Sequence, residues 1–177
     1  MAVAMPNTVT IISHNAFNGA KNLKEIVLPN TVTSIGGWAF SFCSSLTSVT
    51  IGDSVISIGN NAFEECRNLT SVTIPSSVTS IGNSAFYDCV NLKTVINGSD
   101  LTFEDGSTDH GYIAYYADKV VNGLIEGDFA FKEANGKYYL TGYLGNDTHV
   151  VLPDKYNGQG YVIGTDAFNN CNNILSI

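Results

Sequence analysis

Hydrophobic residues recur along the chain at a fixed interval of 23 residues. Three columns keep this interval: Phe17, Phe40, Phe63 and Phe86; Val9, Val32, Val55 and Val78; and Ile12, Ile35, Ile58 and Ile81. Self-similarity at such a period is typical of repeat proteins, in which each unit buries its apolar face against its neighbours. The pattern therefore predicts a stack of similar coils.

Each repeat predicts a short strand followed by a turn and a second buried anchor. In residues 69–74 (LTSVTI), Val72 and Ile74 alternate with polar residues, which marks a strand with one inward face. Pro75 ends this strand because proline cannot donate a ladder hydrogen bond. Ala85 and Phe86 then anchor the far wall of the coil. We expect a right-handed solenoid of α/β type with a parallel sheet on one face, its coils about 4.8 Å apart.

The unit LTSVTIPSSVTSIGNSAFYDC, residues 69–89, resembles the BspA-like, or Treponema pallidum-type, leucine-rich repeat. The resemblance covers residues 3–96 and 151–177. It implies a gently curved leucine-rich-repeat solenoid. It also implies a surface-exposed or secreted protein, often from host-associated bacteria, and some members of the family are adhesins. No catalytic residues come with the family.

The period fails at Asn97 and resumes near Val151, where a fifth unit begins that ends at Cys171. We therefore expect leucine-rich repeats in residues 1–96, an insertion in 97–150 and a final repeat in 151–177. Both ends fall in mid-repeat without a readable polar cap, which solenoids normally need. Two interpretations remain open: a piece of a longer array, or ends that pair head to tail. The expected state is a monomer or a weak end-to-end assembly.

The insertion is predicted to hold a helix and a small antiparallel hairpin sheet. Residues 105–109 are typical of a turn that leads to a helix N-cap, and apolar residues then recur at helical spacing over 110–120. Strands are expected at Phe129–Phe131 and Lys137–Tyr143, joined by a hairpin turn at Asn135–Gly136. A third strand is expected over His149–Leu152, where the chain re-enters the solenoid.

Six of the nine tyrosines lie in the insertion, which also carries −6 of the net charge of −8. Tyrosine offers a large amphipathic contact area at low entropy cost. The candidate ligand contacts are therefore Tyr112, Tyr115, Tyr138 and Tyr143. The alternative is that tyrosines such as Tyr116 and Tyr139 form a small core that joins helix, hairpin and solenoid.

Small hydroxyls face outward on the predicted sheet, among them Thr50 and Thr73. Such a ladder can contact a polypeptide or a glycan through many weak hydrogen bonds, so both residues are candidates. It can equally be a plain solvated sheet.

Cys43, Cys66 and Cys89 lie one period apart, with Ala20 at the equivalent position of the first unit. Stacked equivalents point the same way, which disfavours a metal site, and parallel side-chain vectors oppose a disulfide. We expect a column of buried thiols that pack as small hydrophobic groups.

Charge and composition narrow the function. With a net charge of −8 and a pI near 4.6, the chain has no basic patch for nucleic acid or an anionic membrane. No apolar run approaches the length that spans a bilayer. Residues 1–6 lack the features of a signal peptide, so we expect any export signal to lie outside these residues.

No catalytic motif, metal-binding motif or phosphate loop is present in the sequence, so neither an enzyme nor a cofactor is expected. The leading hypothesis is a secreted or cell-surface binding module, adhesin-like, that recognises a protein or glycan, with host extracellular matrix among the candidates. The rival hypothesis is a structural spacer within a longer surface repeat protein.

Overall fold

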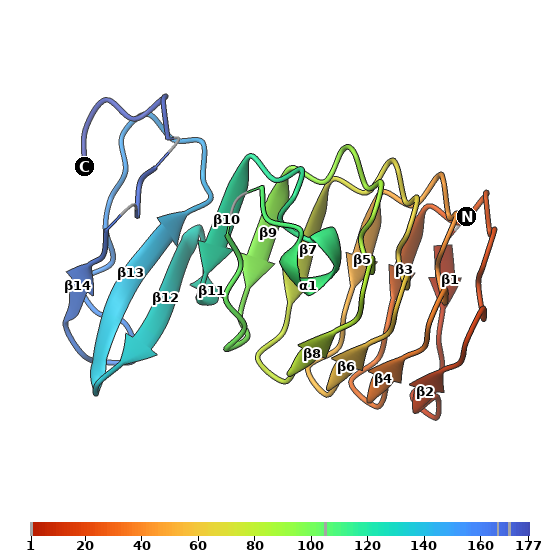
Figure 1. Ribbon diagram of the computed structural model, residues 1–177. Coiled ribbons are helices and arrows are strands. Elements are labelled where there is room, and N and C mark those ends of the chain that lie inside the picture. Colours follow the sequence, from red (N-terminus) through yellow and green to blue (C-terminus); the bar gives the residue numbers. More distant parts are fainter. Residues whose placement is uncertain (1, 105, 166, 170) are drawn as a thin grey trace. The chain divides into compact units, whose positions relative to one another are not determined.

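The computed structural model describes residues 2–104, 106–165, 167–169 and 171–177 (Figure 1). The chain divides into two compact units, Met1–Val120 and Val121–Ile177.

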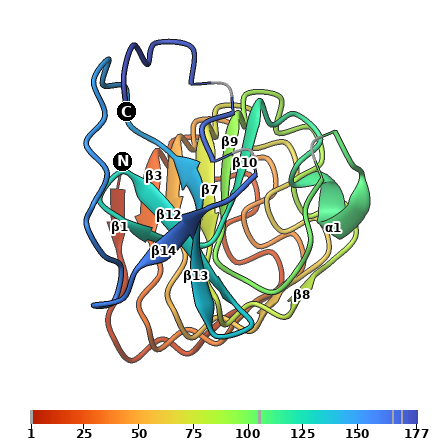
Figure 2. The same ribbon diagram turned by 90° about the vertical axis from the view of Figure 1, so that its left-hand side faces the viewer.

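Unit one is a parallel β-solenoid, as the repeat predicts. One wall holds the strands β1 (Ala2–Ala4), β3 (Glu25–Val27), β5 (Ser48–Thr50), β7 (Ser71–Ile74) and β9 (Thr94–Asn97). Equivalent residues of successive repeats pair in register, for example Val72 with Val95. The side chains of Val49, Val72 and Val95 point inward and are buried, while their neighbours Ser48, Thr50, Ser71 and Thr73 are exposed. Seen along the stack, successive coils superpose (Figure 2).

A second parallel ladder runs along another wall of the same coils. It consists of β2 (Ile11–Ile12), β4 (Ser34–Ile35), β6 (Ser57–Ile58) and β8 (Ser80–Ile81), in the order β2-β4-β6-β8. The sequence analysis expected a sheet on one face and missed this ladder. Strands of two residues are too short to show alternation, which is the signal that identifies a strand.

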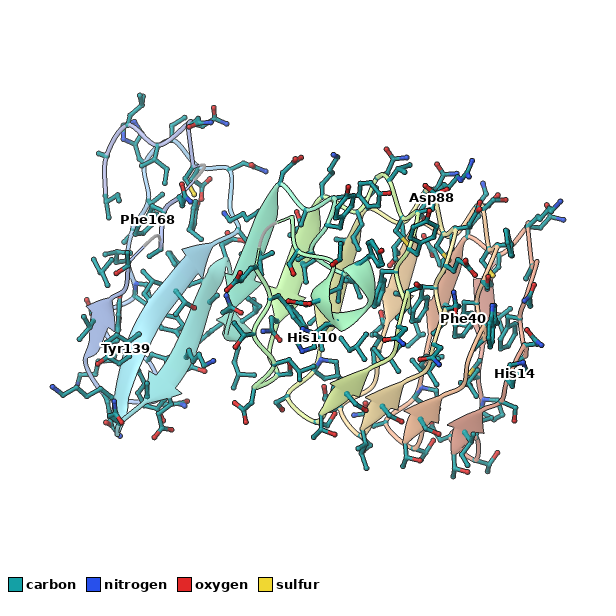
Figure 3. The ribbon with its side chains drawn as sticks, in the orientation of Figure 1. His14, Phe40, Asp88, His110, Tyr139 and Phe168 are labelled. Atoms are coloured by element: carbon teal, nitrogen blue, oxygen red, sulfur yellow. The ribbon has the colours of Figure 1, made fainter. Side chains whose placement is uncertain are left out.

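A stack of phenylalanine rings fills the far side of the core. Phe40, Phe63 and Phe86 are 0% exposed, and the ring centroids of Phe63 lie 5.2 Å from those of Phe40 and 5.1 Å from those of Phe86. The backbone repeats with them, since the amide of Phe40 donates to Ala62 and that of Phe63 to Ala85, both at 2.7 Å. The predicted column is confirmed; Phe40 is labelled in Figure 3.

The three periodic cysteines form a second buried column. Their thiols donate to backbone carbonyls of the preceding coil at 3.1–3.2 Å, for example Cys66 to Phe40 and Cys89 to Phe63. All three are free and buried, as expected for packing thiols. Burial raises the pKa of Cys43 to about 11 and that of Cys89 to about 12, and it also raises the pKa of Cys66.

This burial predicts selective thiol chemistry. Because the thiolate is the reactive form, Cys43, Cys66 and Cys89 should resist a disulfide reagent at pH 8, whereas the half-exposed Cys171 should react. We expect one fast-reacting thiol in the folded native chain and four when the same chain is denatured. The folded Cys171→Ser control should have none. Three or four fast native thiols would contradict the packed column.

The buried thiols also predict a pH dependence of stability. Folding raises the pKa values of Cys43 and Cys89 above 9.0, so their contribution to the free energy of unfolding should be complete below about pH 9. It should decline as the pH rises through 11–12.

The coil stack continues beyond the strict period. Asn97 takes the inward position opposite Ile74, and its buried amide is satisfied by donating to the carbonyl of Leu101 at 2.7 Å and accepting from Ser99. The amide of Phe86 donates to Gly111 at 2.7 Å, which extends the hydrogen-bond series of the phenylalanine column. Residues 98–104 and 106–118 therefore stack on the regular repeats as a longer, divergent coil, which ends at β10 (Lys119–Asn122).

The helix expected over 110–120 is present but much shorter, as α1 (Asp109–Tyr112). Its backbone is irregular, because His110, Gly111 and Tyr112 all have positive φ angles of 49°, 70° and 68°. Gly111 lies so close to the coil below that an added Cβ would meet the carbonyl oxygen of Gly82 at 2.4 Å. The local preference for a helix is overridden by contact with that coil. The helical spacing of the apolar residues does not reveal this contact. Thr108 is the N-cap, without a side-chain capping hydrogen bond.

Unit two is a mixed sheet of β11 (Leu124–Glu126), β12 (Phe129–Ala134), β13 (Lys137–Tyr143) and β14 (Tyr161–Ile163), in that order. The β12–β13 hairpin is confirmed, with Asn135 and Gly136 at φ 53° and 72° in its turn. The strand expected over His149–Leu152 is wrong: His149 makes an isolated bridge to Ser176, and Val151 is 86% exposed. At one edge of the sheet, β11 pairs antiparallel with β12, and Gly123 and Gly127 flank β11 in the sequence.

Candidate binding surface

Four tyrosines of unit one form a continuous edge-to-face chain, here called the tyrosine cluster: Tyr87, Tyr112, Tyr115 and Tyr116. Successive ring centroids lie 5.2, 5.6 and 4.8 Å apart, with interplanar angles of 79°, 69° and 89°. This edge-to-face geometry is favourable for aromatic rings. Tyr87 is 45% and Tyr115 44% exposed, while Tyr112 and Tyr116 are half-buried. The cluster is thus a partly exposed aromatic surface.

The coils beneath the cluster hold its rings in place. Tyr87 directly follows the fully buried Phe86, whose amide donates to the carbonyl of Gly111, the neighbour of Tyr112. On the other side, Ile113 and Ala114 are 0% and 1% exposed and anchor the segment that carries Tyr115. The aromatic surface is therefore attached to the rigid core at both points.

The acidic residue Asp88 lies near the cluster. Burial and then the carboxylate of Asp88 raise the pKa of Tyr116, which places this phenol in a negative environment. Arg67 bridges two of the nearby acids, at 2.5 Å from Asp88 and 2.9 Å from Glu65. These pairs are partly exposed and contribute little stability individually. Glu64, the residue before Glu65, accepts a hydrogen bond from the hydroxyl of Ser41 at 3.3 Å.

A polar pocket of about 370 Å³ adjoins the cluster at Tyr112. Its lining includes Asn83, Ser84, Thr108, Asp109 and His110. The Nδ1 atom of His110 is buried and has no hydrogen-bond partner among the described residues, and its ring packs 5.4 Å from that of Phe103. His110 belongs to α1, on the side of the coils that faces the viewer in Figure 3.

The tyrosines selected from the sequence lie in two different environments. Tyr112 and Tyr115 belong to the tyrosine cluster of unit one. Tyr138 is half-buried in unit two, edge-on to Tyr156 at 5.0 Å. Tyr143 is 1% exposed, and its hydroxyl donates to the Asp147 carboxylate at 3.2 Å. Tyr143 is therefore a core residue of unit two and does not belong to the tyrosine cluster.

Sequence reasoning missed Tyr87. Tyr87 belongs to a regular repeat and not to the tyrosine-rich insertion. Its equivalents in the three earlier units are Asn18, Ser41 and Glu64, all polar. Because Ser41 is 0% exposed, this polar column does not by itself predict an outward position.

Thr50 on β5 and Thr73 on β7 are both exposed on the first wall of the solenoid, where they belong to two separate sheets, β1-β3-β5 and β10-β9-β7. Thr50 has Val27 as its partner on β3, and Thr73 has Ile96 on β9. The hydroxyl ladder is therefore bordered by aliphatic residues on either side. Nothing else about these residues distinguishes them from solvated sheet.

Two stacked parallel ladders, a period of 23 residues and a buried column of phenylalanines define a leucine-rich-repeat solenoid. The family model described as BspA type leucine rich repeat region matches residues 2–107 in six copies, and the chain belongs to this family.

Solved structures with similar chains include three bacterial leucine-rich repeat proteins. A leucine-rich repeat protein from Bacteroides capillosus ATCC 29799 is 36% identical over 50% of this chain and 63% of its own, with a TM-score of 0.47. A leucine rich cell surface protein from Faecalibacterium prausnitzii A2-165 is 28% identical over 93% of this chain and 44% of its own, with a TM-score of 0.49. The T. pallidum leucine rich repeat protein is 26% identical over 69% of this chain and 72% of its own, with a TM-score of 0.46.

The chain thus spans 63% and 44% of the length of the first two of these proteins. No protein with a curated description matches it. Among the described residues, no helix is long and apolar enough to cross a bilayer. The same residues contain no group of three or more His, Cys, Asp and Glu side chains placed to hold a metal ion.

Proposed function

We propose that this chain is a non-catalytic binding module of a cell-surface or secreted protein, adhesin-like, and that the tyrosine cluster is its main ligand contact. The observation that carries the proposal is the cluster itself, in which exposed aromatic rings are attached to a packed core. Repeat solenoids commonly serve as extended binding scaffolds. The family resemblance, which includes surface-exposed and secreted bacterial proteins, supports the location.

The energetics of recognition favour this surface over the others. Binding hot spots are enriched in Tyr, Trp and Arg, and pre-ordered side chains lose little entropy when a ligand binds. Tyr87 and Tyr115 combine exposure with fixed neighbours. The hydroxyls of Thr50 and Thr73 are a second, weaker candidate for contact with a polypeptide or glycan. Tyr138 is a further candidate on unit two.

Tyr115→Ala tests the proposal directly. A screen of the intact chain against host matrix proteins and a glycan panel would first identify a ligand. We then expect Tyr115→Ala to weaken that binding about tenfold or more, because an exposed hot-spot tyrosine contributes roughly 2 kcal/mol. The melting temperature should change little, since Tyr115 is 44% exposed.

Ile56→Ala is the matched control, since it removes a 52% exposed apolar side chain next to β6. It should leave binding unchanged. A large fall in melting temperature for Tyr115→Ala, with binding intact, would instead mean that the cluster is a structural core. Failure of the intact chain to bind any ligand would favour the structural spacer.

A further inference from the structure

We infer that the pocket beside α1 and the adjoining tyrosine cluster together bind a cationic side chain, above all arginine, of a basic polypeptide. This inference rests on the proposed function, because it names the class of partner that the same surface receives. It combines three observations on unit one: the acceptor groups of the pocket, the aromatic ring at its edge and the local charge.

The pocket offers acceptors without a competing cation. Asp109 is exposed, and no lysine or arginine pairs with it in the part of the chain that the structure describes. Asn83, Ser84 and Thr108, whose side chains carry acceptor oxygens, line the same space. A guanidinium group carries five N–H donors and no acceptor, and its planar fork matches a carboxylate in two parallel hydrogen bonds. Asp109 is thus a ready partner for arginine.

An aromatic ring borders this acceptor group. Tyr112 belongs both to the pocket lining and to the tyrosine cluster, so the pocket adjoins the aromatic surface at this residue. Cations are attracted to the face of a tyrosine ring within about 6 Å, and arginine makes this contact more often than lysine. The pocket volume of about 370 Å³ is within the range of small-ligand sites and is ample for one guanidinium side chain.

The local charge selects the same kind of partner. Residues 100–118, which contain α1 and three of the four cluster tyrosines, hold five acidic residues and no lysine or arginine. One of the five, Asp118, is 3.8 Å from Lys93. Such an excess attracts basic segments and repels acidic ones, and it raises the rate of encounter at low salt.

A neutral sugar is the competing occupant, because amide and hydroxyl groups also recognise sugar hydroxyls. It would make no use of the carboxylate excess, and its binding would not depend on ionic strength. The cationic partner accounts for the ring, the carboxylate and the charge together, and it is the one inferred here.

The test uses the full chain and a synthetic peptide of alternating glycine and arginine. The reference peptide carries citrulline, an uncharged isostere, in place of every arginine. Titration calorimetry should show the arginine peptide binding at least tenfold more tightly than the citrulline peptide. Raising the salt from 50 to 500 mM should weaken this binding several-fold, because exposed charges are screened. A neutral oligosaccharide, maltotriose, should not bind.

Two charge-matched variants locate the site. Asp109→Asn removes the carboxylate of the pocket, and we expect a five- to tenfold loss of arginine-peptide binding. Asp53→Asn removes an equal charge from an exposed turn between β5 and β6, and it should cost less than twofold. Tyr115→Phe keeps an aromatic face and should bind nearly as the native chain does. Melting curves of all three verify that they fold.

The outcomes separate this inference from the proposed function. Equal binding of the two peptides, equal loss in the two aspartate variants, or maltotriose binding that depends on Asp109 would overturn the cationic site. If the arginine peptide fails while Tyr115→Ala still abolishes binding of a screened ligand, the proposed function stands and this inference falls. If neither ligand depends on the cluster, both fall.

Discussion

Phe63→Ala is expected to lower the free energy of unfolding by about 3–5 kcal/mol, the usual cost of removing a buried phenylalanine ring. Phe63 is 0% exposed and lies between two parallel rings, at 5.2 Å from Phe40 and 5.1 Å from Phe86. Truncation removes both ring contacts and leaves a cavity in a middle coil, where neighbours on both sides restrict collapse. Urea denaturation followed by circular dichroism measures the change.

Phe17→Ala is the control for that position. Phe17 stacks on Phe40 alone in the ring series and is partly exposed, so its loss should cost clearly less. A denaturation curve that barely shifts for Phe63→Ala would show that the register of the phenylalanine column is wrong.

Gly111→Ala is expected to destabilise the protein by about 2–4 kcal/mol, from overpacking and from a left-handed backbone at a non-glycine residue. A Cβ at this position would lie 2.4 Å from the Gly82 carbonyl oxygen and 2.6 Å from the Ala85 nitrogen, both of them backbone atoms. Relief requires the divergent coil to move away from the coil below. Since Gly111 adjoins Tyr112, the same change should also disturb the tyrosine cluster.

Gly106→Ala separates the steric cost from the backbone cost. Gly106 has a φ of +75°, close to the +70° of Gly111, but nothing lies within 4 Å of its added Cβ. Its replacement should therefore cost only the left-handed penalty, about 1 kcal/mol. Equal destabilisation by the two variants would mean that the divergent coil does not pack on the repeats as described.

Much of unit one could be predicted from the sequence because its contacts are periodic. A residue that recurs every 23 positions meets its own equivalent, so the columns of Phe63 and Cys66 follow from the repeat alone. The β12–β13 hairpin was also accessible, since Asn135 and Gly136 are the residues that its turn requires. These features depend on short-range or strictly repeated chemistry.

The features that were missed depend on contacts between non-equivalent residues. The short α1 and the divergent coil arise where Gly111 packs on Gly82 and Ala85, and no local pattern specifies that approach. The strand expected at His149–Leu152 is absent, and the place beside β13 is taken by β14, which comes from a segment further along the chain.

The candidate site was only half accessible from the sequence. Composition identified Tyr112 and Tyr115, but it could not separate the exposed Tyr115 from the buried Tyr143, since both lie in the same tyrosine-rich segment. Tyr87 joins the site from a regular repeat 25 residues before Tyr112. Tyr87 and Tyr112 come together because the divergent coil stacks on the repeat before it. The 23-residue period ends at Asn97 and therefore does not predict this contact.

The most direct test of the central claim, that the tyrosine cluster contacts the ligand, is a nuclear magnetic resonance titration of the full chain labelled on its nine tyrosine rings. The ligand is the one that the matrix-protein and glycan screen identifies. The account predicts that the ring signals of Tyr87, Tyr112, Tyr115 and Tyr116 shift on addition of ligand, while those of the buried Tyr143 and Tyr156 stay in place. Shifts confined to the tyrosines of unit two, with the four cluster signals unmoved, would contradict it.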